Sequence, residues 1–283
     1  MAPPSYADLG KPGRDLFNKG YNFGFLKLDT TTRANEQVEF KTASSHNVAT
    51  GKLFGSLDLK YKIPKYGMTL TEKWNTDNTL GTEIQMVDQV AKGTKITLDS
   101  TFSPNTGKRT AKVKGDFTHD SIKVTTDIGL NAGPLVNASA VFGYEGWLMG
   151  VQSGFDTKAN TITGTNLAFG RAFGSYNVHT FVNDSSEFGG CVFHRVNDRL
   201  DLAAQASWKS GEQTTNYGLA ALYKVDKDWT LRAKLANKTQ VAVATQHVLN
   251  PHLKITFSAL LNVPNFQEGP HKYGVGLEYE PCC

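Results

Sequence analysis

The stretch Leu53-Phe-Gly-Ser-Leu-Asp-Leu-Lys-Tyr-Lys-Ile63 decides the fold, because its apolar and polar residues alternate with a period of two. From Leu57 to Ile63 every odd position is apolar, and every even position is Asp or Lys. Successive side chains of a strand point to opposite faces, so this pattern predicts an extended strand with one apolar and one charged face.

The same alternation recurs along the chain from about residue 25 onward, with short polar turns between the copies. About 260 residues, divided into strands of about ten residues with turns of three or four, give roughly eighteen to twenty strands. The clearest copies are Leu200–Trp208, Tyr217–Val225, Leu253–Leu261 and Tyr273–Tyr279.

Many long strands, each with one apolar face, favour an all-β fold, a membrane-spanning antiparallel barrel. Closure pairs every backbone polar group, as lipid requires. A large soluble antiparallel sheet with one solvated face fits the alternation as well. The mean hydropathy of −0.36 and 39% apolar residues agree with a barrel, which needs only alternate residues to be apolar. No apolar run approaches the ~18 residues of a membrane-spanning helix.

Residues 1–24 have a different character, and we expect them to form an N-terminal amphipathic helix and a glycine hinge, with residues 25–283 as a single barrel domain. Tyr6, Leu9, Leu16 and Phe17 share one side of a helical wheel, and the charged residues lie largely on the other. Because proline inside a helix costs about 3 kcal/mol, Pro12-Gly13 predicts two short helical turns. A surface helix on a soluble domain is the alternative.

The charged face of the strands carries more bases than acids, with a surplus of about six positive charges if that face lines a lumen. Enclosed positive charge concentrates anions, and a barrel of 16 or more strands stays open to water, so nucleotide-sized anions should pass. The bases are Lys27, Lys41, Lys52, Lys60, Lys62, Lys73, Lys95, Lys112, Lys114, Lys123, Lys209, Lys224, Arg232, Lys234 and Lys254; the acids are Asp29, Glu39, Asp58, Glu83, Asp99, Asp116, Asp127, Asp201 and Glu278.

Glu72 breaks the pattern, because it falls in register with the apolar Leu70 and Trp74 while Thr71 and Lys73 point the other way. A carboxylate facing lipid is costly and would recruit a partner or a proton. A position at the end of a strand, level with the lipid headgroups, would make it cheap instead.

Catalysis and metal binding find little support. The seven histidines are scattered, and no Gly-x-Ser-x-Gly, Walker A or His-Glu-x-x-His motif occurs. We expect no enzyme, no cofactor and no metal site. Three cysteines, two of them the adjacent Cys282 and Cys283, exclude a disulfide framework, and a pI near 8.8 is too mild to indicate nucleic acid.

The stretch Thr71-Glu-Lys-Trp-Asn-Thr-Asp-Asn-Thr-Leu-Gly-Thr-Glu83 resembles the eukaryotic porins, the voltage-dependent anion channels of the mitochondrial outer membrane. Further similar motifs are Tyr6–Lys11, Phe102–Lys108, Gly143–Leu148, Glu187–Gly190 and Gly276–Glu278, so the resemblance spans the chain. It implies a 19-stranded barrel with the N-terminal helix inside the pore.

The resemblance also implies roles for single residues. Lys11, Arg14, Asp15 and Lys19 match charges of the pore helix. Lys95 belongs to Gly93-Thr94-Lys95, which replaces the family's Gly-Leu-Lys at a proposed nucleotide contact. With the lumen bases Lys112 and Lys114 these residues form our candidate pore and gating set. Glu72 matches a membrane-facing glutamate linked to hexokinase docking, divalent-cation effects and self-association. Lys272, Gly274, Leu277 and Tyr279 resemble the last-strand signal that the barrel-insertion machinery reads.

The function implied is a voltage-gated, weakly anion-selective channel of the mitochondrial outer membrane, through which ions and small metabolites such as ATP and ADP diffuse passively. Its partners would be the lipid bilayer and anionic permeants. The alternative is a membrane docking scaffold for cytosolic partners such as hexokinase or apoptosis regulators, with a minor transport role.

Overall fold

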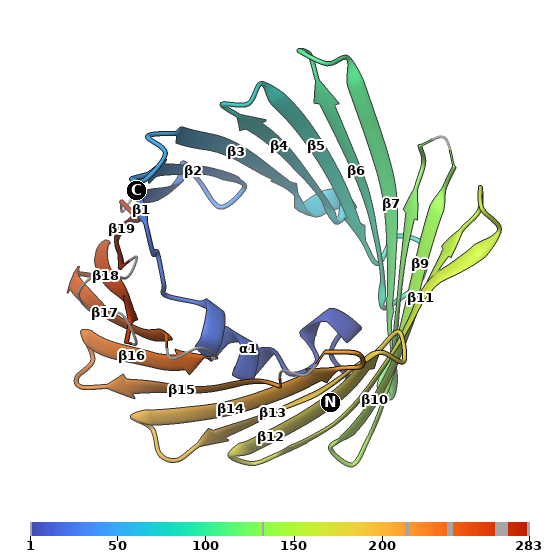
Figure 1. Ribbon diagram of the computed structural model, residues 1–283. Helices are drawn as coiled ribbons and strands as arrows, with labels where there is room; N and C mark the ends of the chain where they lie inside the picture. The colour runs from blue at the N-terminus through green and yellow to red at the C-terminus, as the bar shows by residue number, and fades with distance from the viewer. Residues whose placement is uncertain (1, 132, 213–214, 237–239, 264–270, 282–283) are drawn as a thin grey trace.

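The computed structural model describes residues 2–131, 133–212, 215–236, 240–263 and 271–281, which leaves Cys282 and Cys283 outside the described residues. Over these residues it is a closed barrel of nineteen strands with one helix inside, which confirms the all-β prediction (Figure 1). The strands are β1 (Phe25–Arg33), β2 (Val38–Asn47), β3 (Leu53–Ile63), β4 (Met68–Asn75), β5 (Thr79–Val87), β6 (Thr94–Ser103), β7 (Lys108–Thr118), β8 (Ile122–Gly129), β9 (Leu135–Tyr144), β10 (Trp147–Asp156), β11 (Thr161–Phe173), β12 (Tyr176–Asn183), β13 (Glu187–Arg195), β14 (Leu200–Lys209), β15 (Asn216–Lys224), β16 (Trp229–Ala236), β17 (Gln240–Asn250), β18 (Leu253–Asn262) and β19 (Lys272–Tyr279).

The barrel closes through one parallel pair of strands, because an odd number of strands that alternate in direction leaves the first and the last running the same way. Leu26 of β1 lies opposite Val275 of β19, and Leu28 lies opposite Leu277. Every other neighbouring pair is antiparallel. Dividing the chain length by the length of a strand and a turn predicts roughly eighteen to twenty strands and cannot choose among these numbers.

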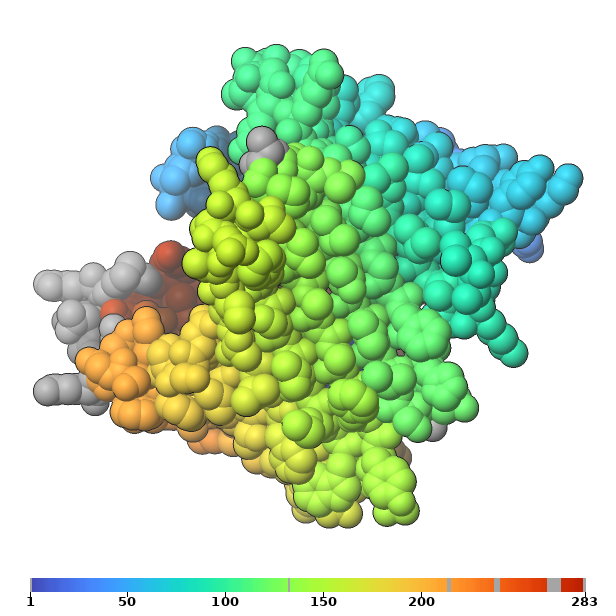
Figure 2. All heavy atoms as spheres, turned by 90° about the vertical axis from the view of Figure 1, so that its right-hand side faces the viewer, coloured from blue at the N-terminus to red at the C-terminus, as the bar shows by residue number. Residues whose placement is uncertain are grey.

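The two faces of the wall follow the alternation. Side chains such as Leu28, Trp74 and Leu219 point outward and are 45%, 57% and 57% exposed. Their neighbours along the strands point into the lumen. Figure 2 shows one side of the outer wall as a continuous surface of side chains from the middle of the chain.

The N-terminal segment lies inside the barrel, where α1 (Lys11–Asn18) runs along β13, β14 and β15 (Figure 1). A 3₁₀ turn, η1 (Tyr6–Asp8), precedes it, and a second, η2 (Pro64–Tyr66), joins β3 to β4. The prediction that Pro12-Gly13 divides the helix was wrong in its position. Pro12 stands in the first turn of α1, where its missing N–H has no intrahelical partner to lose. The break falls at Gly10, whose φ of +67° is the left-handed conformation that glycine tolerates.

Among the described residues, no helix combines the length and the apolar character that a membrane crossing needs.

Candidate functional site

Two hydrophobic contacts fasten the N-terminal segment to the inner wall. In the first, Leu9 is 2% exposed and packs against Val141 of β9 and Ala168 of β11, with Tyr6 and Phe181 beside them. The sequence predicted an apolar side for this segment, and the structure shows that this side faces the wall rather than lipid.

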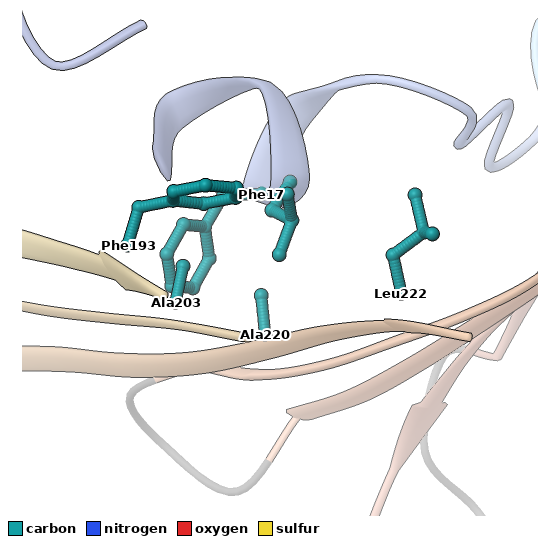
Figure 3. Close-up of a cluster of buried hydrophobic side chains, with 6 residues drawn as sticks. Phe17, Phe193, Ala203, Ala220 and Leu222 are labelled. Carbon is teal, nitrogen blue, oxygen red and sulfur yellow. The ribbon is translucent and has the colours of Figure 1, made fainter. Parts of the chain in front are cut away.

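In the second contact, Leu16 and Phe17 of α1 lie on a patch formed by four side chains of β13, β14 and β15 (Figure 3). Phe17 is 4% exposed. Fully burying a Leu or Phe side chain contributes about 1.5–3 kcal/mol, so the three anchors Leu9, Leu16 and Phe17 hold the segment with roughly 5 kcal/mol or more. The wall residues of the patch are Phe193, Ala203, Ala220 and Leu222.

Replacing Phe17 by Ala should loosen α1, because truncating a buried Phe costs about 3 kcal/mol or more. We expect backbone amides of α1 to exchange with solvent at least tenfold faster, measured by hydrogen–deuterium exchange. Phe188→Ala is the control: Phe188 stands on the outer face of β13, stacked on Trp208, so its loss leaves α1 untouched. Equal exchange of α1 in the parent and in Phe17→Ala would contradict the anchoring role.

A polar contact closes the C-terminal end of α1. The Lys234 Nζ of β16 donates a hydrogen bond of 2.5 Å to the carbonyl oxygen of Phe17 and lies 4.4 Å from the centre of the Tyr21 ring. A cation at this end also favours the helix dipole. Burial of the Tyr21 hydroxyl raises its pKa to about 12, so this ring stays neutral beside Lys234 at physiological pH.

The predicted hinge passes over β19. Asn22 donates its backbone N–H to Ser258 Oγ at 3.0 Å, and its carbonyl oxygen would lie only 1.7 Å from a Cβ atom at Gly274. No side chain fits there, so Gly274 has a packing reason to be glycine besides the predicted targeting role. No pattern in the sequence indicates this contact, since Asn22 and Gly274 are far apart in the chain.

The four predicted charges of the pore helix lie together on α1 and its C-cap, and most are neutralised by close partners. Lys11 Nζ lies 2.9 Å from Asp8 Oδ1, and Lys19 Nζ lies 2.8 Å from Asp15 Oδ2. The Arg14 guanidinium donates to the backbone carbonyl of Ala7. Arg14 is therefore the charge of this segment that no acidic side chain pairs with among the described residues.

A hydrogen bond from Ser5 and a second one from Lys11 lower the pKa of Asp8. The Lys11–Asp8 hydrogen bond also raises the pKa of Lys11. Because the pKa of Asp8 is lower in the folded segment, the stabilisation is present above the ordinary Asp pKa. It is lost as pH falls through the lowered value.

The predicted wall lysines lie elsewhere in the lumen, on β6 and β7, and do not join α1 in one cluster. In the strand register, Lys95 lies opposite Asp116, and Lys112 lies opposite Asp99. Lys114 Nζ is 3.7 Å from Asp99 Oδ2 and lies opposite Asp127 in the register with β8. This part of the wall is thus close to neutral.

Several lumen bases face no acid in the strand register of the described residues. Arg232 and Lys234 of β16 lie beside the N-terminal segment, whereas Lys27, Lys62, Lys123 and Lys224 lie on other strands. The register places the predicted lumen bases and acids on the inner face, except Lys52, which precedes the first residue of β3. It adds six inner charges near strand ends that the alternation missed: Arg33, Lys108, Asp156, Glu187, Arg195 and Lys272.

Glu72 lies in the interior of β4 and points outward, in register with Leu59 and Thr82. The Thr82 hydroxyl donates a hydrogen bond of 3.1 Å to Glu72 Oε2, which gives the carboxylate a polar partner on the apolar face. The alternative that Glu72 stands at the end of a strand is wrong, because β4 continues to Asn75. Of the β19 residues, Lys272 and Gly274 share the lumen face, whereas Leu277 and Tyr279 share the outer face.

The chemistry that these residues support is electrostatic. Among the described residues, no three His, Cys, Asp or Glu side chains converge as a metal site requires. The inner wall carries a positive surplus, part of it beside α1 at Arg232 and Lys234, and the barrel surrounds it with a low-dielectric wall.

Comparisons with known proteins identify porins and voltage-gated channels as similar to this chain. The sequence profile described as eukaryotic porin matches residues 2–274. The chain is 50% identical to the probable voltage-dependent anion-selective channel of Caenorhabditis elegans, over 99% of both chains. It is 49% identical to the non-selective voltage-gated ion channel VDAC2 of Meleagris gallopavo, over 98% of this chain and 94% of that one. It is 47% identical to the voltage-dependent anion-selective channel of Drosophila melanogaster, over 99% and 100% of the two chains.

Proposed function

The chain belongs to the eukaryotic porin family, and on that premise we propose that it is a voltage-gated, weakly anion-selective channel of the mitochondrial outer membrane. Ions and small anionic metabolites, nucleotides among them, would diffuse through it passively. The observation that carries the proposal is the closed 19-stranded barrel whose inner face holds a surplus of positive charge. Family membership favours transport over catalysis and over a purely scaffolding role.

Weak rather than strong selectivity suits the arrangement of charge. Many lumen bases face an acid across the strand register, as Lys73 faces Asp58, and Lys73 Nζ also lies 2.7 Å from the diagonal neighbour Glu83. Such pairs contribute little net field, so the preference would come from the bases that face no acid, among them Arg232 and Lys234 beside α1. The relatives' names include both anion-selective and non-selective channels, and the surplus beside α1 supports anion preference for this chain.

The direct test is reconstitution in a planar bilayer under a KCl gradient. We expect stepwise conductance, closure at high voltage of either sign, and a reversal potential of the sign that chloride preference produces. Absence of conductance would reject the channel, and a cation-selective open state would reject the argument from lumen charge.

Voltage alone is too weak to pull α1 off the wall. The segment with Asp8, Lys11, Arg14, Asp15 and Lys19 carries one net positive charge. At a few tens of millivolts a unit charge gains about 1 kcal/mol, against the roughly 5 kcal/mol that its apolar anchors supply. We therefore propose that gating rearranges charged side chains of the lumen wall, with α1 still seated.

The outward carboxylate of Glu72 supports a regulatory role at the lipid face, and we place hexokinase docking, divalent-cation effects and self-association there. Apoptosis regulators are further proposed partners. The last-strand residues Lys272, Gly274, Leu277 and Tyr279 are proposed as the insertion signal, and residues 1–24 and 25–283 as the gating segment and the barrel domain.

Replacing Glu72 by Gln should weaken hexokinase or divalent-cation effects severalfold and leave open-channel conductance unchanged, because the side chain faces lipid. Vesicle co-flotation measures the first and bilayer recording the second. Glu83→Gln is the matched control, since Glu83 faces the lumen on the next strand and pairs with Lys73. A change of conductance in Glu72→Gln, with partner effects intact, would remove Glu72 from this role.

A further inference from the structure

One end of the outer wall carries a row of aromatic rings across β10, β11, β12 and β13, in two groups. The Trp147 and Phe169 rings lie 5.1 Å apart, and Phe173 and Tyr176 lie 5.6 Å apart. Tyr176 stacks on the His194 ring at 4.0 Å with an interplanar angle of 6°. Phe173 and Tyr176 are direct neighbours in the strand register, as are Tyr176 and His194. Part of this wall faces the viewer in Figure 2.

Arg171 stands in the middle of this row. It lies opposite Trp147 in the register, and its guanidinium carbon is 4.4 Å from the centre of the Trp147 ring and 5.2 Å from that of Phe173. Its neighbours Gly170 and Ala172 belong to the inner face, where Gly170 lies opposite His179, so Arg171 points outward.

No carboxylate pairs with Arg171 among the described residues. Glu145, in the turn between β9 and β10, forms no ion pair with it. The contrast is Arg195, at the same end of the barrel but on the lumen face, whose Nε lies 3.3 Å from Asp201 Oδ1. A guanidinium has five N–H donors and no acceptor, and its contact with the two rings forms no ion pair or hydrogen bond to a carboxylate or carbonyl. Among the described residues, the Arg171 side chain has no hydrogen-bond acceptor, so its N–H groups remain free to donate.

The depth of Arg171 in a membrane follows from its place in the strand. It is two residues from Phe173, where β11 ends, or about 7 Å along the strand at ~3.4 Å per residue. Trp and Tyr rings are enriched at the level of the lipid headgroups. A cation there costs little, whereas at the bilayer midplane it would cost about 2–4 kcal/mol.

We propose that Arg171, positioned between the Trp147 and Phe173 rings, binds the phosphate of an anionic membrane lipid. A phosphate accepts two parallel hydrogen bonds from a guanidinium edge. The unpaired charge of Arg171 repels the cationic choline or ethanolamine group of a zwitterionic lipid, so a lipid with net negative charge fits better. The inference rests on the proposed membrane location of the barrel and goes beyond the channel function.

The test uses Trp147 as a reporter in the full-length chain, with Trp74, Trp208 and Trp229 replaced by Phe. The protein is placed in phosphatidylcholine nanodiscs that contain increasing mole fractions of a brominated lipid. One series uses brominated phosphatidylglycerol, and the other uses brominated phosphatidylcholine over the same range. Hydrogen bonds to a charged group are worth enough that we expect half-maximal quenching at about tenfold less phosphatidylglycerol. Arg171→Gln should abolish this difference, and Arg195→Gln, which removes a charge at the same end of the lumen face, should preserve it.

Native mass spectrometry of the chain with its four tryptophans intact gives a second measurement, in which the parent and Arg195→Gln should retain a phosphatidylglycerol molecule that Arg171→Gln loses. Equal quenching by both lipids in the parent, or a preference that survives Arg171→Gln, would overturn the proposal. Bilayer conductance recorded on the same proteins tests the channel function separately from the lipid site. Normal conductance without lipid preference rejects the lipid site alone, and absent conductance rejects the channel.

Discussion

Replacing Lys112 and Lys114 by Glu moves the reversal potential under a KCl gradient toward cations, to parity or beyond. The two changes lower the lumen charge by about four units, against a surplus of about six. They also leave Asp99 and Asp127 facing like charges in the strand register, so this stretch of wall turns from nearly neutral to strongly acidic. Planar-bilayer recording in the open state measures the effect.

The matched control is Lys92→Glu with Lys158→Glu. It changes the charge of the chain equally, in turns outside the strands. Charges beyond about 8–10 Å are largely screened at physiological salt, so we expect a much smaller shift. An unchanged reversal potential in the Lys112/Lys114 variant would mean that these side chains do not line the conducting path.

A Gly13→Cys variant, oxidised to a disulfide with Cys191, still closes with voltage. A Cβ atom at position 13 would lie 3.7 Å from Cys191 Cβ, within the ~3.5–4.5 Å that disulfides require, so one substitution suffices to tie α1 to β13. Since the apolar anchors already outweigh the voltage energy on the segment, the tie removes no motion that gating needs. We expect the fraction of channels closed at high voltage to change by less than twofold.

The tethered protein carries Cys282→Ser and Cys283→Ser so that no other thiol competes, and the same variant under reducing conditions is its control. Mass spectrometry verifies the disulfide before recording. Loss of voltage closure in the oxidised form, restored by reduction, would show that α1 must leave the wall and would refute the proposal that wall charges move instead.

The sequence predicted what depends on period two and could not predict what depends on tertiary contact. The alternation around Leu57 placed Asp58 and Lys60 on the inner face, because neighbouring side chains of a strand must point apart. It failed for Lys52, since a turn imposes no such rule. Alternation also cannot fix strand number, because one strand more or fewer changes neither the pattern of residues nor the length of a turn.

The helix shows the same limit. Its amphipathic side was readable, and the wall patch under Phe17 was not, because Phe193, Ala203 and Ala220 lie on three strands that meet only after folding. The prediction from Pro12 was wrong because the free-energy cost of a proline depends on its place in the helix. It is small in the first turn, and Pro12 stands there because the helix begins directly after Gly10. The row of rings around Arg171 was hidden likewise, since each strand contributes only one or two of its members.

The parallel seam between β1 and β19 sets an order of events during folding. It joins residues near 26 to residues near 275, among the most distant pairs in the chain, so its loop-closure entropy is the largest and its pairing the slowest. Gly24 donates its N–H to Tyr273 at 2.9 Å, and Asn22 rests on Gly274, on the inner side of that seam. The N-terminal segment must therefore already be inside when the last two edges meet, so that sealing the barrel also encloses its helix.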